Sequence, residues 1–288
     1  GVSYKDTSTL DRVRKRDFHN VMQTDPSADL GIHGAAAGVE TIQERLSCRI
    51  RTTDIAQRCG AADLLVARHI LEHAHDLHGF MRGLDALIAP GGFVAFEVPD
   101  FQIALSQFDY STVWEEHAVY FTPSTFARAF RRLGLELVAS VLYPYPLENS
   151  LVAVARREEA TPAGAATQID AREDALLGRA YRAEFPRFRQ RMERYLDAFR
   201  REQGPIAIFG AGHLACKFVN LLGLKNLIEF VVDDHPQKKG MYMPGSRLPI
   251  QESAALTGRG IRLCLTSLNP ESEEKVLSKN QQFVKQGG

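Results

Sequence analysis

Cysteine is scarce in this sequence, and the four cysteines among its 288 residues never form a CxxC pair. Disulfide frameworks and cysteine-ligated zinc sites both require regular cysteine spacings. The histidines His75, His78 and His213 also have no metal-ligand companions at a typical spacing. These features predict free thiols in a cytoplasmic protein and no bound metal.

The sequence also lacks an excess of either charge, because 35 Lys and Arg residues balance 35 Asp and Glu residues. A nucleic-acid-binding chain usually carries a basic excess. No apolar run approaches the roughly 20 residues that a membrane-spanning helix needs, and no signal peptide is visible. We therefore expect no nucleic-acid or membrane partner. The chain opens on Gly1 without Met, and we expect the full protein to be longer.

Apolar runs alternate with helical periodicity in the first half of the chain, which predicts an α/β domain. The pattern predicts strands over 18–24, 62–67 and 93–99, helices over 77–88 and from Thr122 to about Leu133, and an antiparallel pair over 135–143 and 150–155. Proline and glycine at 90–92 should stop the first of these helices.

A charged segment rich in Ala, Pro and Gly, over 156–164, predicts a linker. The pattern after it predicts an amphipathic helix over 170–202 broken at Pro186, then a strand over 206–209, a glycine turn over 210–215, a helix over 216–222 and a strand over 228–232. The chain therefore divides into a domain at 1–157, a helical linker at 158–203 and a second domain at 204–288.

Two acid–histidine clusters follow predicted strands of the first domain. Glu72-His73 comes soon after the strand over 62–67, and Glu116-His117 follows the strand over 93–99. Ligands of open α/β sheets bind at the carboxyl ends of the strands, so the two clusters predict a site for proton transfer. The alternative is that these residues satisfy hydrogen bonds at strand ends.

The second domain contains Gly210-x-Gly212-x-x-Ala215, with Asp233 23 residues after Gly210. A glycine turn that opens a helix can hold a phosphate on backbone N–H groups, and an acid at this spacing can bind a ribose. The alternative is a structural turn with no ligand. The irregular segment after Asp233 makes NAD chemistry the least favoured function.

The motifs as a group resemble a known family. The chain resembles S-adenosylmethionine-dependent methyltransferases at residues 25–27, 67–73, 89–92 and 97–100. The stretches 114–117 and 120–121 are similar to sugar C-methyltransferases, in which a methyltransferase domain precedes a small Rossmann-like domain. The chain resembles this second domain of the family at residues 209–212, 232–240 and 244–250.

The resemblance implies a class I methyltransferase Rossmann-like domain followed by a second, smaller Rossmann-like domain. It also implies a keto-sugar substrate linked to a nucleotide. In this family a base removes the proton beside the ketone, and the enolate takes the methyl group. His117 matches the base, Glu116 would orient its ring, and His73 would donate to the enolate oxygen. Trp114 and Tyr120 would line the sugar pocket.

The resemblance further implies S-adenosylmethionine as cofactor and assigns two sets of binding residues. The cofactor set is Gly1, Asp25, Asp54, Arg68 and His69. The second domain would contact the nucleotide-sugar through Gly210, Gly212, Asp233 and Lys239, with Lys238 nearby. Residue type also allows a simple turn at Asp25 and a helix N-cap at Asp54.

Several positions depart from the family pattern. Trp114 replaces a tyrosine, which removes a group that can exchange a proton, and Glu115 replaces a frequent histidine. Only Gly1 remains of the glycine-rich donor loop, where Ser3 and Tyr4 would crowd the donor and Lys5 would place a positive charge near its sulfonium. Residues 146–151 lack the glycines of the family's corresponding stretch, and the family's cysteine-rich zinc module is missing.

These departures leave alternatives to a C-methyltransferase. One is an O- or N-methyltransferase on another glycan intermediate, and another is a non-catalytic nucleotide-sugar-binding protein with a degenerate methyltransferase fold. The sequence leaves the oligomeric state open, with a homodimer as one possibility.

Overall fold

The computed structural model describes residues 1–34, 38–114, 116–132, 134–145, 148–157 and 172–287. These residues divide into two compact units, Gly1–Tyr181 and Arg182–Gly288. Each unit has its own sheet and its own apolar core. Within the described residues, no helix combines the length and apolar character needed to cross a membrane.

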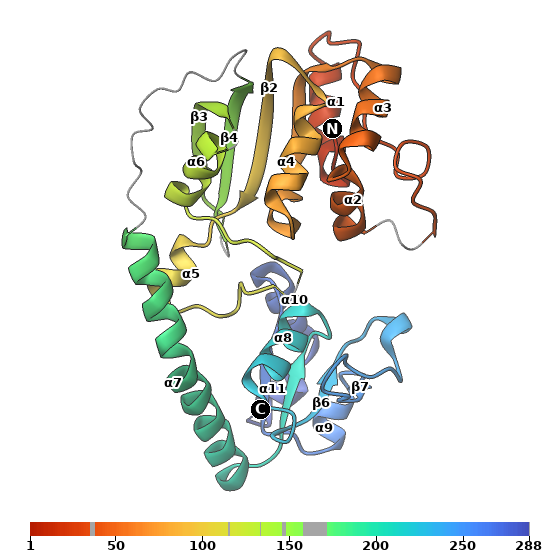
Figure 1. Ribbon diagram of the computed structural model, residues 1–288. Helices are drawn as coiled ribbons and strands as arrows, with labels where there is room; N and C mark the ends of the chain where they lie inside the picture. The colour runs from red at the N-terminus through yellow and green to blue at the C-terminus, as the bar shows by residue number, and fades with distance from the viewer. Residues whose placement is uncertain (35–37, 115, 133, 146–147, 158–171, 288) are drawn as a thin grey trace. The chain divides into compact units, whose positions relative to one another are not determined.

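The first unit contains a four-stranded mixed sheet in the order β1-β2-β4-β3. Its strands are β1 (Ala62–Arg68), β2 (Ile88–Pro99), β3 (Leu135–Tyr143) and β4 (Ser150–Arg157). β1 and β2 are parallel, whereas β4 pairs antiparallel with β2 and β3. Figure 1 shows β2, β3 and β4 side by side. The predicted closing pair of antiparallel strands is thus confirmed.

Helices of the first unit pack against this sheet through apolar side chains. The helices of this unit are α1 (Thr7–Arg14), α2 (Val39–Leu46), α3 (Arg49–Cys59), α4 (Leu77–Asp85), α5 (Gln102–Gln107) and α6 (Pro123–Arg132). The burial of β2 alternates, so that Val94, Phe96 and Val98 face the core. Phe80 of α4 and Phe130 of α6 join the same apolar cluster. Alternation of this kind buries one face of a strand and leaves the other for polar groups.

Gly83 explains how α4 can lie so close to α2. A Cβ at this position would come within 1.9 Å of the Leu46 carbonyl oxygen. Only a residue without a side chain allows that approach.

A continuous helix, α7 (Arg172–Glu202), begins in the first unit and ends in the second. The predicted break at Pro186 is wrong, because the helix runs through this residue. Proline lacks the N–H that would bond to the preceding turn, but apolar residues of the helix pack against the second core, among them Phe185, Phe188 and Met192. Most of the linker predicted over 156–164 lies outside the described residues.

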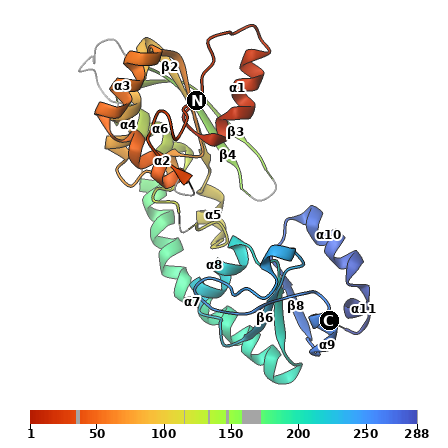
Figure 2. The same ribbon diagram turned by 90° about the vertical axis from the view of Figure 1, so that its right-hand side faces the viewer.

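The second unit is a parallel four-stranded sheet in the order β7-β6-β5-β8. Its elements are β5 (Ile206–Phe209), α8 (His213–Leu222), β6 (Ile228–Val232), β7 (Ile250–Gln251), α9 (Ala255–Gly258), β8 (Leu263–Thr266), α10 (Pro270–Lys279) and α11 (Gln281–Lys285). Figure 2 shows β6 and β8 within this unit. The predicted strand–turn–helix–strand order is confirmed, and with it the Rossmann-like character of the second unit.

Two local predictions for the first unit are wrong. Residues 18–24 form neither a strand nor a helix. β2 begins at Ile88 and not at Phe93, so the strand includes the residues at 90–92 that were expected only to stop a helix. A register shift between Ala62 and Leu64 of β1 accommodates this early start.

Candidate active site

The first turn of the chain lies against the edge of β1. The Val2 N–H donates to the Val66 carbonyl at 3.1 Å. The buried Asp6 carboxylate accepts hydrogen bonds from the N–H groups of Val2, Ser3 and Arg68 at 2.7–3.0 Å. Burial raises the pKa of Asp6, although these backbone bonds oppose the shift. A turn followed by α1 is therefore fixed at the carboxyl end of β1.

Gly1 and Asp25, two of the predicted cofactor residues, belong to neighbouring segments. The Gly1 carbonyl accepts from the Thr24 N–H at 2.9 Å and from its hydroxyl at 2.8 Å. Asp25 follows directly and is exposed. One oxygen of its carboxylate accepts from the Ala28 N–H at 2.6 Å, which is the simple turn that residue type allowed.

Asp54 lies in the interior of α3, with its side chain exposed. The predicted N-cap at this position is wrong, because Cys48 occupies the N-cap of that helix. No described contact joins Asp54 to Gly1, Asp25 or Arg68.

Arg68 and His69, at the end of β1, are held by acidic groups. Arg68 bonds to Glu97 at 2.5 Å and to the Lys5 carbonyl at 2.8 Å, which ties it to the first turn. His69 lies 3.4 Å from both Glu72 and Glu97. Its backbone φ of +49° is unusual for a residue with a side chain and suggests a constrained site.

Hydrogen bonds within this network shift the pKa values of His69 and Glu97 in opposite directions. Burial alone would lower the pKa of His69, but hydrogen bonds to Glu72 and Glu97 outweigh it and raise this pKa to about 9. The hydrogen bond from His69, aided by Arg68, lowers the pKa of Glu97 to about 2. His69 is therefore a cation at neutral pH and binds two carboxylates together.

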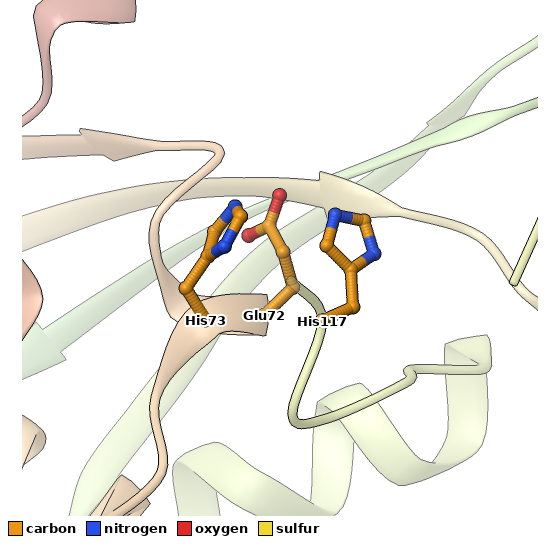
Figure 3. A group of neighbouring side chains, drawn as sticks. All are labelled: Glu72, His73 and His117. Carbon is orange, nitrogen blue, oxygen red and sulfur yellow. The ribbon is translucent and has the colours of Figure 1, made fainter. Parts of the chain in front are cut away.

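The two predicted acid–histidine clusters come together after the carboxyl ends of β1 and β2. The rings of His73 and His117 are 4.9 Å apart between centroids, at an interplanar angle of 84°. Glu72 completes the group, and in the view of Figure 3 its side chain is seen between those of His73 and His117. One ligand atom from each of the three side chains lies within 4.8 Å of the others. We call these three residues the Glu72 cluster.

Backbone hydrogen bonds fix the Glu72 cluster. The Glu72 carbonyl accepts from the N–H groups of Ala118 and Val119 at 2.9 and 3.0 Å. Nδ1 of His73 lies 3.0 Å from the Glu116 carbonyl oxygen. A carbonyl can only accept, so Nδ1 of His73 is the donor of this hydrogen bond, which leaves Nε2 as the ring nitrogen that can meet a ligand.

The carboxylate beside His117 in this group is that of Glu72. Glu116, the predicted orienting acid, has an exposed side chain, and its carbonyl is what contacts His73. The sequence places Glu72 in the first acid–histidine cluster but predicts no individual role for it. The feature of the sequence that points to Glu72 is its position directly before His73, because the structure brings both residues close to His117.

Trp114 and Tyr120 adjoin the same cluster. Their rings lie 6.3 and 5.8 Å from that of His117 between centroids. The Tyr120 hydroxyl accepts from the Trp114 N–H and donates to the Trp114 carbonyl, both at 2.9 Å. Tyr120 thus closes the loop that carries His117, and its ring packs on Phe101 at 4.3 Å.

The glycine turn of the second unit is held by protein groups. Gly210 has a φ of +103°, and a Cβ there would come within 2.7 Å of the Ser267 carbonyl oxygen. Asp233 accepts from the Ala211 N–H at 2.9 Å and from Lys238 at 2.8 Å. Despite the opposing effect of burial, these bonds lower the pKa of Asp233.

The remaining predicted residues of this turn are placed differently. Gly212 forms the N-cap of α8, and a Cβ there would meet nothing within 4 Å. Lys239 pairs with Glu252 at 2.5 Å. In this turn the N–H groups of Gly210 and Ala211, the Asp233 carboxylate and both lysines have protein partners.

Comparison with known families accounts for both units. Residues 7–140 match a methyltransferase domain, and residues 150–288 match a C-methyltransferase C-terminal domain. The chain therefore combines a region that matches a methyltransferase domain with a region that matches a C-methyltransferase C-terminal domain. The family resemblance seen in the sequence is therefore confirmed. S-adenosylmethionine is the methyl donor of this methyltransferase fold.

One characterised relative covers almost the whole chain. The C-methyltransferase NovU of Streptomyces niveus is 26% identical over 281 residues, which is 93% of this chain. The chain spans 65% of the length of NovU.

Solved structures resemble part of the chain. A methyltransferase from Methanosarcina mazei is 11% identical, covers 35% of this chain and 61% of its own, and has a TM-score of 0.30. A 1,6-didemethyltoxoflavin N1-methyltransferase from Burkholderia thailandensis is 20% identical, covers 38% and 56%, and has a TM-score of 0.28. The assignment therefore rests on the two domain matches.

The residues around the first turn fit this cofactor in part. Gly1 packs closely on α1, Asp25 presents an exposed carboxylate beside Thr24, and Arg68 fixes the turn. An exposed carboxylate can accept the hydroxyls of a ribose. Asp54 contributes nothing that the structure shows.

Proposed function

We propose that the chain transfers a methyl group from S-adenosylmethionine to a carbon beside the ketone of a nucleotide-linked sugar. The Glu72 cluster carries the proposal, because two histidines and a buried carboxylate meet in a C-methyltransferase family member. A carbon beside a ketone becomes a nucleophile only after it loses a proton, and a positioned histidine has a suitable pKa for that step.

In this mechanism His117 accepts the proton from the sugar carbon, and the electron pair of the C–H bond moves toward the ketone oxygen. His117 is half-buried, so a substrate can reach its ring. S-adenosylmethionine, when bound, supplies a methyl group already activated on a sulfonium sulfur. Trp114 and Tyr120 orient the sugar, and Gly1 with Asp25 holds the donor.

His73 acts on the developing enolate oxygen only as a cation. Its Nδ1 proton is committed to the Glu116 carbonyl, so donation from Nε2 requires a second proton on the ring.

Two readouts with the same substrate test the proposal. Mass spectrometry of the product would locate the transferred methyl group, and deuterium exchange at the acidic carbon in D2O would report proton removal alone. We expect methylation at carbon, with exchange lost in His117→Ala. Exchange retained in that variant would exclude His117 as the base, and a methyl group on oxygen or nitrogen would favour the O- or N-methyltransferase alternative.

A non-catalytic nucleotide-sugar-binding function is favoured by one observation. The first turn places Tyr4 and Lys5 where a glycine-rich loop would leave room for the donor. Calorimetric titration with S-adenosylmethionine distinguishes this alternative. Absence of binding by a folded chain that still binds a nucleotide-sugar would support it.

A further inference from the structure

The Glu72 carboxylate is incompletely satisfied within the protein. Its side chain is 2% exposed, and among the described residues its Oε2 atom has no hydrogen-bond partner. Its other oxygen faces Nδ1 of His69 at 3.4 Å. A buried carboxylate oxygen without a partner costs free energy on the order of 1–3 kcal/mol or more. Such an atom indicates a site completed by a group that is not part of the chain.

His73 has the arrangement of a metal-binding histidine. It is 5% exposed, and its Nδ1–H donates to the Glu116 carbonyl. Histidine ligands usually donate their second N–H to a carbonyl or carboxylate, which fixes the ring and leaves the other nitrogen for the ion. The free electron pair of His73 is therefore on Nε2.

The three side chains are close enough to share one ion. Their ligand atoms lie within 4.8 Å of one another. Tetrahedral ligands bound at about 2.0–2.1 Å are separated by about 3.4 Å, so small side-chain rotations would bring them into range. Two histidines and one glutamate form a familiar ligand set for Zn²⁺ and related ions, with further positions open.

We propose that Glu72, His73 and His117 bind a divalent transition-metal ion such as Zn²⁺. The proposal extends beyond the predicted donor and sugar sites, and it replaces the sequence-based expectation of no metal. That expectation considered cysteines and histidines with neighbouring companions, whereas here the adjacent Glu72 and His73 are joined by His117, which lies 44 residues after His73. The half-buried His117 leaves a ligand position of the ion accessible.

The ion and the proposed base function compete for the same atom. A ring nitrogen of His117 that holds an ion has no electron pair left for a proton. Zn²⁺ should therefore inhibit methyl transfer as it fills the cluster. This consequence rests on the proposed function, whereas binding of the ion does not.

Direct titration tests the ion site. Zn²⁺ would be titrated calorimetrically into the full chain after removal of metals with EDTA, and Co²⁺ would report histidine and carboxylate coordination through its visible absorption. We expect one ion per chain, with affinity reduced at least about 10-fold in Glu72→Gln and in His117→Ala. Binding should be unchanged in His78→Ala and in Cys48→Ser, because both of these side chains are exposed and lie outside the cluster.

Circular dichroism in EDTA would show that each variant is folded. His117→Ala guards against misfolding of the Glu72 variant, since residue 117 lies on a partly exposed loop. No saturable binding by the folded wild-type chain would overturn the proposal. Equal affinity in wild type, Glu72→Gln and His117→Ala would overturn it as well, because the ion would then lie elsewhere.

Measuring methyl transfer during the Zn²⁺ titration separates the ion-site proposal from the proposed function. Inhibition that follows the Zn²⁺ binding curve and is reversed by EDTA supports both. Saturable binding at the cluster with undiminished methyl transfer supports the ion site and excludes His117 as the base. Absence of methyl transfer under every condition contradicts the proposed function, while the titration still gives its result for the ion.

Discussion

The two units carry comparable polar groups at the ends of their strands, but they satisfy them differently. In the second unit, the Asp233 carboxylate binds a backbone N–H and a lysine of the same turn. In the first unit, the buried Glu72 carboxylate retains an oxygen without a protein partner. A carboxylate satisfied by its own chain needs no ligand, whereas a buried carboxylate oxygen left unsatisfied is explained by one. The chemistry of the chain is therefore expected in the first unit.

Replacement of His117 should have the largest effect. We expect His117→Ala to reduce kcat for methyl transfer by about 10²–10⁴-fold, because the variant removes the proposed base. Steady-state transfer of labelled methyl groups would measure it. The matched control, His78→Ala, removes an exposed histidine on α4 and should retain full activity. A decrease of less than about 3-fold in His117→Ala would argue against a catalytic role.

Gly210→Ala should unfold the second unit selectively. The φ of +103° and the contact with the Ser267 carbonyl predict a loss of about 2–4 kcal/mol in unfolding free energy. Trp114, the sole tryptophan, reports the first unit by fluorescence during denaturation, and circular dichroism reports both units.

Because the units have separate cores, we expect Gly210→Ala to shift the unfolding transition followed by circular dichroism and to leave the transition followed by Trp114 fluorescence unchanged. Gly258→Ala is the control, since a Cβ at this helical residue meets nothing within 4 Å. Equal shifts in both variants would mean that the strained turn has no special structural importance.

Asp25→Ala should weaken binding of S-adenosylmethionine about 10-fold, because lost hydrogen bonds to an ionised group are each worth about 1.5–3 kcal/mol and water compensates part of that. Isothermal titration would measure the Kd. Asp54→Ala should leave it unchanged, since Asp54 lies exposed within α3. The opposite ranking would restore the role in cofactor binding that the family resemblance implied for Asp54.

The smallest effect is expected at Asp233. Its folded-state pKa lies below the usual value of 3.8, so its ion pair stabilises the fold above that pH and loses this contribution as the pH falls through the folded pKa. Denaturation of wild type between pH 5 and pH 2.5 should show this decline. In Asp233→Asn, stability at neutral pH should be lower and its pH dependence below 4 shallower. An identical acid profile in the variant would contradict the assignment.

Much of the architecture could be predicted from local patterns. The antiparallel pair at 135–143 and 150–157 and the strand–turn–helix at 206–222 follow from alternation, glycine and helical periodicity. The break at Pro186 could not be judged locally, because packing of α7 against the second core outweighs one missing hydrogen bond. Residues 18–24 have strand-like composition, yet they form no strand; Met22 and Thr24 instead form hydrogen bonds with the backbone of Gly1.

The candidate site was predicted in part. That His73 and His117 would meet followed from their positions after parallel strands. The sequence could not show which carboxylate lies beside His117, because Glu72 and Glu116 are equally plausible by residue type. The choice depends on the turn at Leu71–His73 and on the loop carrying His117, which place the Glu72 carboxylate close to both rings and leave the Glu116 side chain exposed.

The way the loop recognises residue 72 has a consequence for how this protein could change. Ala118 and Val119 hold that residue through its main-chain carbonyl, which every amino acid possesses. The anchoring of the loop is thereby separated from the chemistry of the side chain at this position. A single codon change at 72 could exchange an acid for an amide or a small apolar group and still preserve the path of the backbone, so this position offers evolution or an engineer an economical way to alter reactivity.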